Sequence, residues 1–68
     1  MILFELLYFL KDSTMIKIKI GNELLYSGDV YTYRTTPIER YAIHMKISSI
    51  DIVIEFNTPV IIITLGVK

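Results

Sequence analysis

Cysteine and tryptophan are absent from this 68-residue sequence, and histidine occurs once, at His44. Without cysteine, neither a disulfide nor a thiolate zinc site can reinforce so small a fold. One histidine among seven scattered carboxylates is also a poor basis for a metal cage. We therefore expect no metal site and no cofactor.

An excess of charge of either sign is also lacking. Seven basic and seven acidic residues give a net charge of zero, and neither sign is clustered along the chain. Nucleic-acid binders usually carry a basic excess that displaces phosphate counterions, so a nucleic-acid partner is not expected. A net charge near zero gives little protection against self-association, which fits an obligate assembly.

Long hydrophobic runs are missing as well. The apolar segment from Ile2 to Leu10 is far shorter than the roughly 20 residues that span a bilayer. No basic residue precedes it, and the polar sequence KDST follows it where a signal peptide would have small residues. We expect no membrane span and no signal peptide and, because cysteine is absent, a cytoplasmic location.

Apolar residues are what the sequence has in excess. They make up 53% of the chain, and thirteen residues are isoleucine. A chain of this length buries only about 60% of its unfolded surface, and large exposed apolar patches usually mark contacts. We therefore expect a homodimer or a larger assembly, with another protein as a further partner. In size and composition the chain is similar to the small β-rich accessory proteins of phages and mobile elements, although no motif carries that resemblance.

Residues 1–12, MILFELLYFLKD, predict a short helix. With 3.6 residues per turn, Glu5, Tyr8 and Asp12 fall on one narrow stripe, and apolar side chains cover the rest. Such a helix has to lie across a sheet and also contact another chain. An extended strand and a disordered or membrane-touching tail are the alternatives. We expect residues 1–14 to form a helix or arm beside an antiparallel β domain of residues 15–68.

From residue 15 the hydrophobic period changes to two. MIKIKI alternates as a strand, Gly21-Asn22 supplies a turn, and ELLYS returns as a second strand. Gly28-Asp29 predicts a second turn or a bulge. VYTYRT at residues 30–35 is rich in residues that favour strands, so it predicts a third strand.

The clearest strand pattern lies between residues 41 and 56. Folding the chain at Ser48-Ser49 brings apolar side chains opposite one another on one face, so the pattern predicts a hairpin with its turn at these serines. The predicted pairs are Ile47 with Ile50, Met45 with Ile52, Ile43 with Ile54, and Tyr41 with Phe56.

VIIITL at residues 60–65 predicts the last strand, after a turn at Asn57-Thr58-Pro59. It is apolar on both faces, as expected for a strand that is covered on both sides. The sequence thus predicts a mainly β fold of the α+β class. We expect a small antiparallel sheet of four to five strands, barrel-like or a meander, with one short N-terminal helix. Two sheets that are completed only in a dimer are the alternative topology.

Catalytic chemistry has little support in the sequence. His44 would need a nucleophile or a carboxylate beside it, but alternation gives it Lys46 as a neighbour on its own face. Asp51 and Glu55 share a face, yet nothing forces them to converge as a pair of acid–base groups must. We expect His44 to be an ordinary solvent-facing histidine, and we expect no catalytic residue and no enzymatic activity.

The expected function is a small non-catalytic protein–protein interaction or structural module that acts as a homo-oligomer. The alternative is a binding module for nucleic acid, carbohydrate or a small apolar ligand, with Tyr31, Tyr33 and Arg34 on a strand as its ligand-binding residues. The expected interface of the first function comes from the N-terminal helix and the last strand: Leu6, Leu7, Leu10, Ile61, Ile63 and Leu65.

Overall fold

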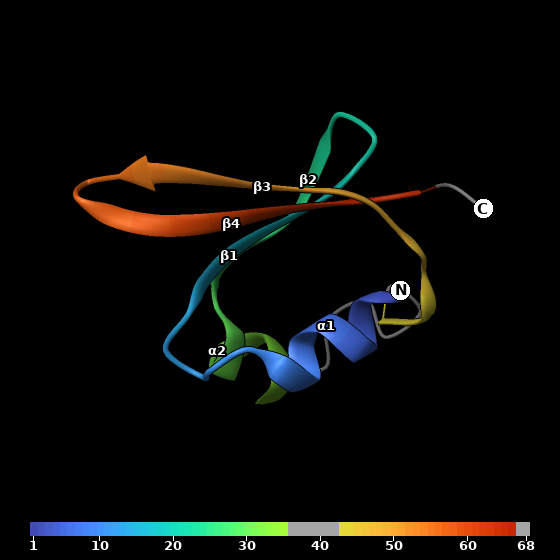
Figure 1. The fold of residues 1–68 in the computed structure, drawn as a ribbon, viewed down its shortest axis with the longest axis horizontal. Coiled ribbons are helices and arrows are strands. Elements are labelled where there is room, and N and C mark those ends of the chain that lie inside the picture. The colour runs from blue at the N-terminus through green and yellow to red at the C-terminus, as the bar shows by residue number, and fades with distance from the viewer. Residues whose placement is uncertain (36–42, 67–68) are drawn as a thin grey trace.

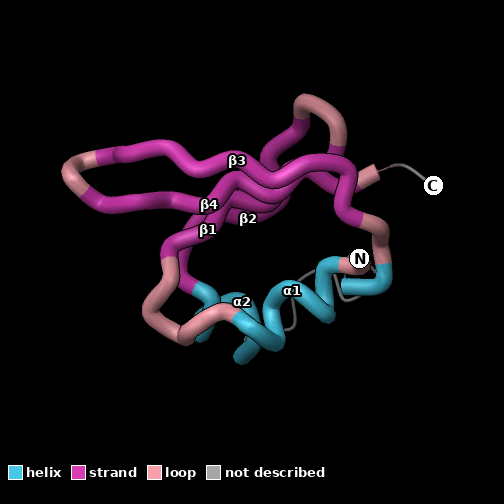
Figure 2. The backbone as a smooth tube through the Cα atoms, in the orientation of Figure 1, coloured by secondary structure: helices cyan, strands magenta, loops and turns pink. Residues whose placement is uncertain are grey.

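The computed structural model describes residues 1–35 and 43–66. These residues form two layers, a four-stranded sheet and two short helices that lie against one of its faces (Figure 1). The same view as a backbone tube shows the last two strands reaching beyond the helices at one end (Figure 2). The predicted mainly β fold with an N-terminal helix is confirmed. The elements are α1 (Leu3–Phe9), β1 (Met15–Ile20), β2 (Glu23–Asp29), α2 (Val30–Thr35), β3 (Ile47–Glu55) and β4 (Thr58–Leu65).

The helix α1 forms because its apolar residues repeat at helical spacing. Leu3 and Leu7 are four residues apart and buried, while Leu6 and Leu10 are half-buried and pack against the same core. Glu5 completes the first turn, because its carboxylate accepts a hydrogen bond of 2.9 Å from the backbone N–H of Ile2.

The sheet is mixed, with the strand order β2-β1-β4-β3. The pairs β1–β2 and β3–β4 are antiparallel, but β1 and β4 run parallel, with Ile18 opposite Ile63. The prediction of a wholly antiparallel sheet is therefore wrong. The four described strands do not close into a barrel, because β2 and β3 are left as edges. β4 lies between β1 and β3, and both helices lie on one face of the sheet, so the apolar residues on the other face of β4 are not covered by a helix (Figure 1).

The predicted turn at Ser48-Ser49 is also wrong. Both serines lie within β3, and the chain reverses at Phe56-Asn57, before β4 begins at Thr58. A register shift next to Ser48 shows that the serines form an irregularity in the strand instead of a turn. Tyr41, which the prediction paired with Phe56, lies outside the described residues.

The error in predicting a hairpin at Ser48-Ser49 has a simple physical cause. Isoleucine at every second position fits a straight strand as well as it fits a folded one, since both keep the apolar side chains on one face. The strand β4 is a longer partner for β3 than the segment that precedes β3 in the sequence. The pairs that form are Ile50 with Ile63, Ile52 with Ile61, and Ile54 with Pro59.

The segment VYTYRT forms the helix α2, not the predicted third strand. Asp29 caps this helix, because its Oδ1 accepts the N–H of Thr32 at 3.2 Å. The N–H groups of the first two helical residues donate to carbonyl groups of the loop between α1 and β1. Helical spacing then buries both Val30 and Tyr33, so tertiary contacts override the strand propensity of the segment.

The predicted hairpin of β1 and β2 is confirmed, with its turn at Gly21-Asn22. Gly21 has a φ of 60°, which costs glycine little. A register shift between Ile18 and Lys19 marks a bulge, so β2 is an irregular edge strand. Near its end, a Cβ on Gly28 would lie 2.6 Å from the hydroxyl of Tyr26, so this position requires glycine.

The hydrophobic core lies between the helices and the sheet. Isoleucines of β1 and β4 form its floor, and α1 and α2 contribute the covering side chains. Its members are Leu3, Leu7, Ile16, Ile18, Val30, Tyr33, Ile63 and Leu65.

The floor of the core gives a first prediction. Replacing the fully buried Ile18 by valine should lower the free energy of unfolding by about 0.5–1.5 kcal/mol, because a methylene group is lost from a packed site. Leu24→Val is the control, since that side chain is exposed on β2 and its loss of a methylene should change little. Urea denaturation of both variants measures the difference, and equal effects would contradict the assignment of the core.

The α2 cap gives a prediction about pH. Hydrogen bonding by Thr32, first through its side chain and then through its backbone N–H, lowers the pKa of Asp29 below its ordinary value of 3.8. A lowered pKa means that the ionised carboxylate stabilises the fold above pH 3.8, and that this contribution is lost as the pH falls through the folded-state pKa. Asn also caps helices but does not titrate. Urea denaturation between pH 7 and pH 2 should therefore show a steeper acid loss for the natural chain than for Asp29→Asn, and parallel curves would contradict it.

Candidate interaction surface

The three residues predicted to bind a ligand lie on α2 and do not share one face. Tyr31 is exposed, whereas Tyr33 is buried in the core with its ring centroid 4.9 Å from that of Tyr26. Arg34 is engaged within the chain. The strand face on which Tyr31 and Tyr33 were expected to lie together is therefore not present, because the segment is a helix and not a strand.

Arg34 joins the two helices. Its Nη1 donates to Asp12 Oδ1 at 2.9 Å, and its Nη2 donates to the carbonyl oxygens of Leu7 and Leu10. These carbonyls belong to the C-terminal end of α1, where a cation is favourable. The guanidinium thus serves as the cap of a neighbouring helix, which accounts for its presence without a ligand.

The six residues predicted to form an interface divide into two groups. Leu7, Ile63 and Leu65 are buried in the core of the single chain and have almost no surface left for a partner. Leu6, Leu10 and Ile61 are half-buried and pack against that core. Their participation in contacts between chains stays a prediction, and the exposed apolar residues of the structure are different ones.

The residues considered for catalysis are spread over the surface. His44 is exposed and lies in a short 3₁₀ turn before β3, and Asp51 and Glu55 are separated along that strand. Glu55 is paired with Lys17, with 2.7 Å between Oε2 and Nζ. Among residues 1–35 and 43–66, no group of three or more His, Cys, Asp or Glu side chains could hold a metal ion.

The Lys17–Glu55 ion pair covers apolar surface on the sheet face away from the helices. Lys17 lies opposite Ile62 and Glu55 opposite Thr58, so a contact between their side chains has to pass over Val60. Val60 is accordingly buried although neither helix covers this face. This ion pair therefore has a structural role, through the alkyl stem of the lysine as much as through its charge.

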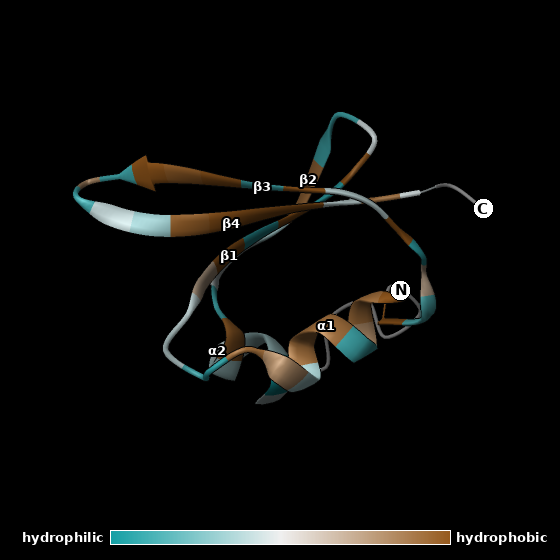
Figure 3. Ribbon diagram, in the orientation of Figure 1, coloured by the Kyte–Doolittle hydropathy of each residue, from teal (hydrophilic) through white to brown (hydrophobic). Residues whose placement is uncertain are grey.

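The first exposed apolar surface lies on β3 and its turn, and we call it the β3 surface: Ile50, Ile52, Ile54 and Phe56. The three isoleucines are on the same face of the sheet as the core, by alternation with their partners on β4. They are exposed because the helices end before them, as the uncovered brown ribbon of β3 illustrates (Figure 3). Ile52 and Ile54 each keep 68% of their surface exposed.

The dimensions of the elements explain this exposure. A helix of seven residues such as α1 is only about 10 Å long. The nine residues of β3 extend over roughly 30 Å. The two short helices therefore cover one part of the sheet, and the end of the β3–β4 hairpin remains outside their reach (Figure 1).

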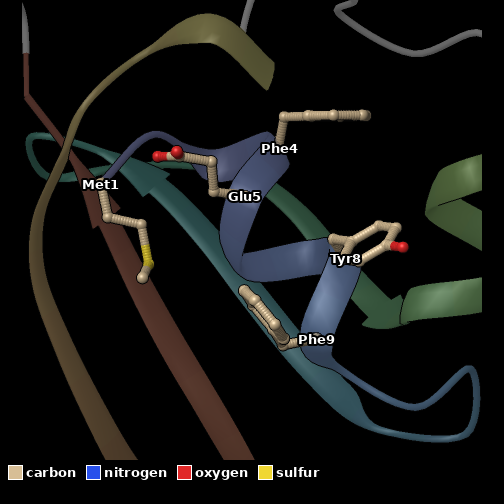
Figure 4. A pocket seen from close by; sticks show the side chains of 5 residues that line it. All are labelled: Met1, Phe4, Glu5, Tyr8 and Phe9. Carbon is tan, nitrogen blue, oxygen red and sulfur yellow. The ribbon is translucent and has the colours of Figure 1, made fainter.

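The second exposed apolar surface lies on the outer side of α1, and we call it the α1 surface: Met1, Phe4, Tyr8 and Phe9. Together with Glu5 these residues line an open hollow of about 640 Å³. Phe4 and Tyr8 project to one side of the helix, and Met1 and Phe9 project to the other (Figure 4). The rings of Tyr8 and Phe9 meet edge to face, with 5.6 Å between their centroids.

Phe56 combines exposure with an unfavourable backbone. It is 99% exposed, and both turn residues have positive φ, 51° at Phe56 and 63° at Asn57. Asparagine tolerates this conformation, but a phenylalanine there has steric strain that glycine would avoid. A two-residue hairpin turn normally carries Asn-Gly or Asp-Gly, so the ring of Phe56 is not explained by the fold of the single chain.

Within the described residues, the outer edge of β3 has no partner strand along most of its length. The N-terminal residues cover only its beginning, where Ile47 N donates to Met1 O at 2.9 Å. From Ser49 to Glu55, β3 pairs with β4 alone within the described part of the chain. Since Glu55 and Thr58 flank a two-residue turn as a hydrogen-bonded pair, alternation directs the N–H and C=O groups of Ile50, Ile52 and Ile54 outward.

The sequence signal for the β3 surface is isoleucine at positions 50, 52 and 54. The predicted hairpin places these side chains on a core face, because it expects a folded partner opposite them. A straight strand with the same pattern keeps these side chains on the core face but carries them past the helices. No sequence signal identified Phe56 as a turn residue, because phenylalanine is rare at positive φ.

No known family model matches the chain, and neither a curated protein nor a solved structure is significantly similar to it. Neither of the helices within the described ranges has the length and apolar content needed to cross a bilayer.

The turn gives a prediction about stability. Phe56→Gly should raise the free energy of unfolding by up to about 1 kcal/mol, because glycine adopts positive φ without steric strain and the exposed ring contributes no packing. Asn57→Gly is the matched control, with a smaller gain because asparagine already suits its position. Thermal and urea denaturation compare the variants, and a clear loss of stability in Phe56→Gly would show that the ring is packed, either within the chain or between copies.

Proposed function

We propose that the chain is a small, non-catalytic protein–protein interaction module that acts as a homo-oligomer. The observation that carries the proposal is the set of large apolar side chains left exposed on the β3 and α1 surfaces. A protein that works as a monomer rarely keeps contiguous apolar surface of this kind, because burying it against a partner is favourable.

The charge pattern agrees with this function. The chain has no net charge, so two copies do not repel one another at long range. The described charged side chains near the β3 surface lie on the opposite face, where Glu55 is neutralised by Lys17. The β3 surface is therefore apolar without an intervening charge, as the centre of a protein interface usually is.

An enzymatic function has weaker support. His44 and Asp51 are exposed, Glu55 is paired with Lys17, and Arg34 is used to cap α1. We place the module in the cytoplasm, since a chain without cysteine suits a reducing compartment.

Light scattering after size exclusion tests the proposal. At micromolar concentration the natural chain should have a mass clearly above the 7.9 kDa of one copy. The mass should persist when salt is raised from about 0.1 M to about 1 M, because burial of apolar surface is not screened as charge pairs are. A mass of one copy at all concentrations would reject the homo-oligomer.

Variants of the two surfaces show which one is used. Ile52→Thr with Ile54→Thr removes apolar area from β3 but keeps strand propensity, and Phe4→Gln with Phe9→Gln does the same for the helix α1. At least one of these pairs should lower the mass, and Ser13→Ala, an exposed change outside both surfaces, should not. Circular dichroism confirms that each variant is folded.

A further inference from the structure

We infer that the partner of the β3 surface is a second copy of this chain, and that two β3 strands pair edge to edge in antiparallel orientation about a two-fold axis at Ile52. This inference rests on the proposed function and specifies the partner and the geometry of its contact. The resulting dimer has one continuous sheet of eight strands, four from each copy.

The open edge has the main-chain groups that such pairing needs. Ile50, Ile52 and Ile54 direct their N–H and C=O groups outward, at alternate positions, as the free side of an antiparallel ladder requires. Natural edge strands are usually protected by a bulge, a proline or a lysine. From Ser49 to Glu55 this edge has none of these.

The other edge of the sheet is protected in the usual way. The strand β2 has a bulge opposite the step from Ile18 to Lys19, and its end at Gly28 is closely approached by the hydroxyl of Tyr26. An irregular strand does not offer a regular ladder to a neighbour. Pairing through β3 alone therefore closes after two copies and does not continue into a fibre.

The charges on β3 select the register of the pair. An axis at Asp51 places this carboxylate opposite its own counterpart, and an axis at Val53 places Asp51 opposite Glu55 of the second copy. Like charges directly opposite one another destabilise a sheet. An axis at Ile52 avoids both, because Asp51 then faces Val53 and Glu55 faces Ser49.

The same axis gives the longest regular ladder. It pairs Ile52 with Ile52 and Ile50 with Ile54, so residues 49–55 of both copies take part without including the irregularity at Ser48. An axis at Ile50 would draw that irregularity into the ladder, and an axis at Ile54 would shorten the ladder and place it against the turn. The isoleucines of the two copies then form one cluster on the face that carries both helical layers.

Cysteine scanning tests this geometry directly, because the natural chain has no cysteine. The single variants Ile50→Cys, Ile52→Cys and Val53→Cys, which keep both carboxylates of β3, are oxidised under mild conditions and separated on non-reducing gels. Directly opposed residues of a hydrogen-bonded pair have Cα atoms about 5.5 Å apart, within the range of a disulfide. Residues displaced by two positions are more than about 7 Å apart and cannot be bridged.

We expect Ile52→Cys to become mostly a covalent dimer, and Ile50→Cys and Val53→Cys to stay mostly monomeric on the gel. Preferential dimerisation of Ile50→Cys or Val53→Cys would overturn the register. If none of the three forms the dimer while the natural chain still has a mass above one copy, the contact lies elsewhere, the inference fails and the proposed function stands. If the natural chain has the mass of one copy throughout, the proposed function fails as well.

Discussion

The difference in length between the helices and the strands is the constraint on which the rest of this structure depends. Two helices of seven and six residues lie over a sheet whose longest strands have nine and eight. Because a helix rises about 1.5 Å per residue and a strand about 3.3 Å, the helices cannot cover the whole face. The core forms beneath them, and the isoleucines beyond their ends stay in contact with water.

The contacts at the helix ends fix this limit. Arg34 closes the C-terminal end of α1 through the carbonyls of Leu7 and Leu10, and Asp29 begins α2 through the N–H of Thr32. A capped end does not extend, since its hydrogen bonds are already satisfied by other groups. Arg34, which the sequence made a candidate for ligand binding, is thus one of the residues that determine how much of the sheet is covered.

Local patterns predicted the elements that depend on local forces. The helix α1, from the spacing of Leu3 and Leu7, and the turn at Gly21-Asn22 could be predicted, because neighbouring residues determine them. The helix α2 could not be predicted from the sequence. Its residues favour a strand, but hydrogen bonds to loop carbonyls and burial in the core stabilise the helix. The parallel pairing of β1 with β4 was missed for the same reason, as it joins segments far apart in sequence.

The incorrect prediction of a hairpin at Ser48-Ser49 and the proposed dimer have one cause. A strand with isoleucine at every second position is complementary to many apolar strands, including an identical one, so its hydrophobic pattern does not define a single partner or register. Within the chain, the parallel neighbour β1 and the turn at Phe56-Asn57 place β4 beside β3. On the outer edge the described residues supply no such restraint, and the carboxylates of Asp51 and Glu55 are the features that distinguish one register from another. Specificity at this edge therefore comes from the charges on the opposite face of β3, whereas the tendency to associate comes from the isoleucines.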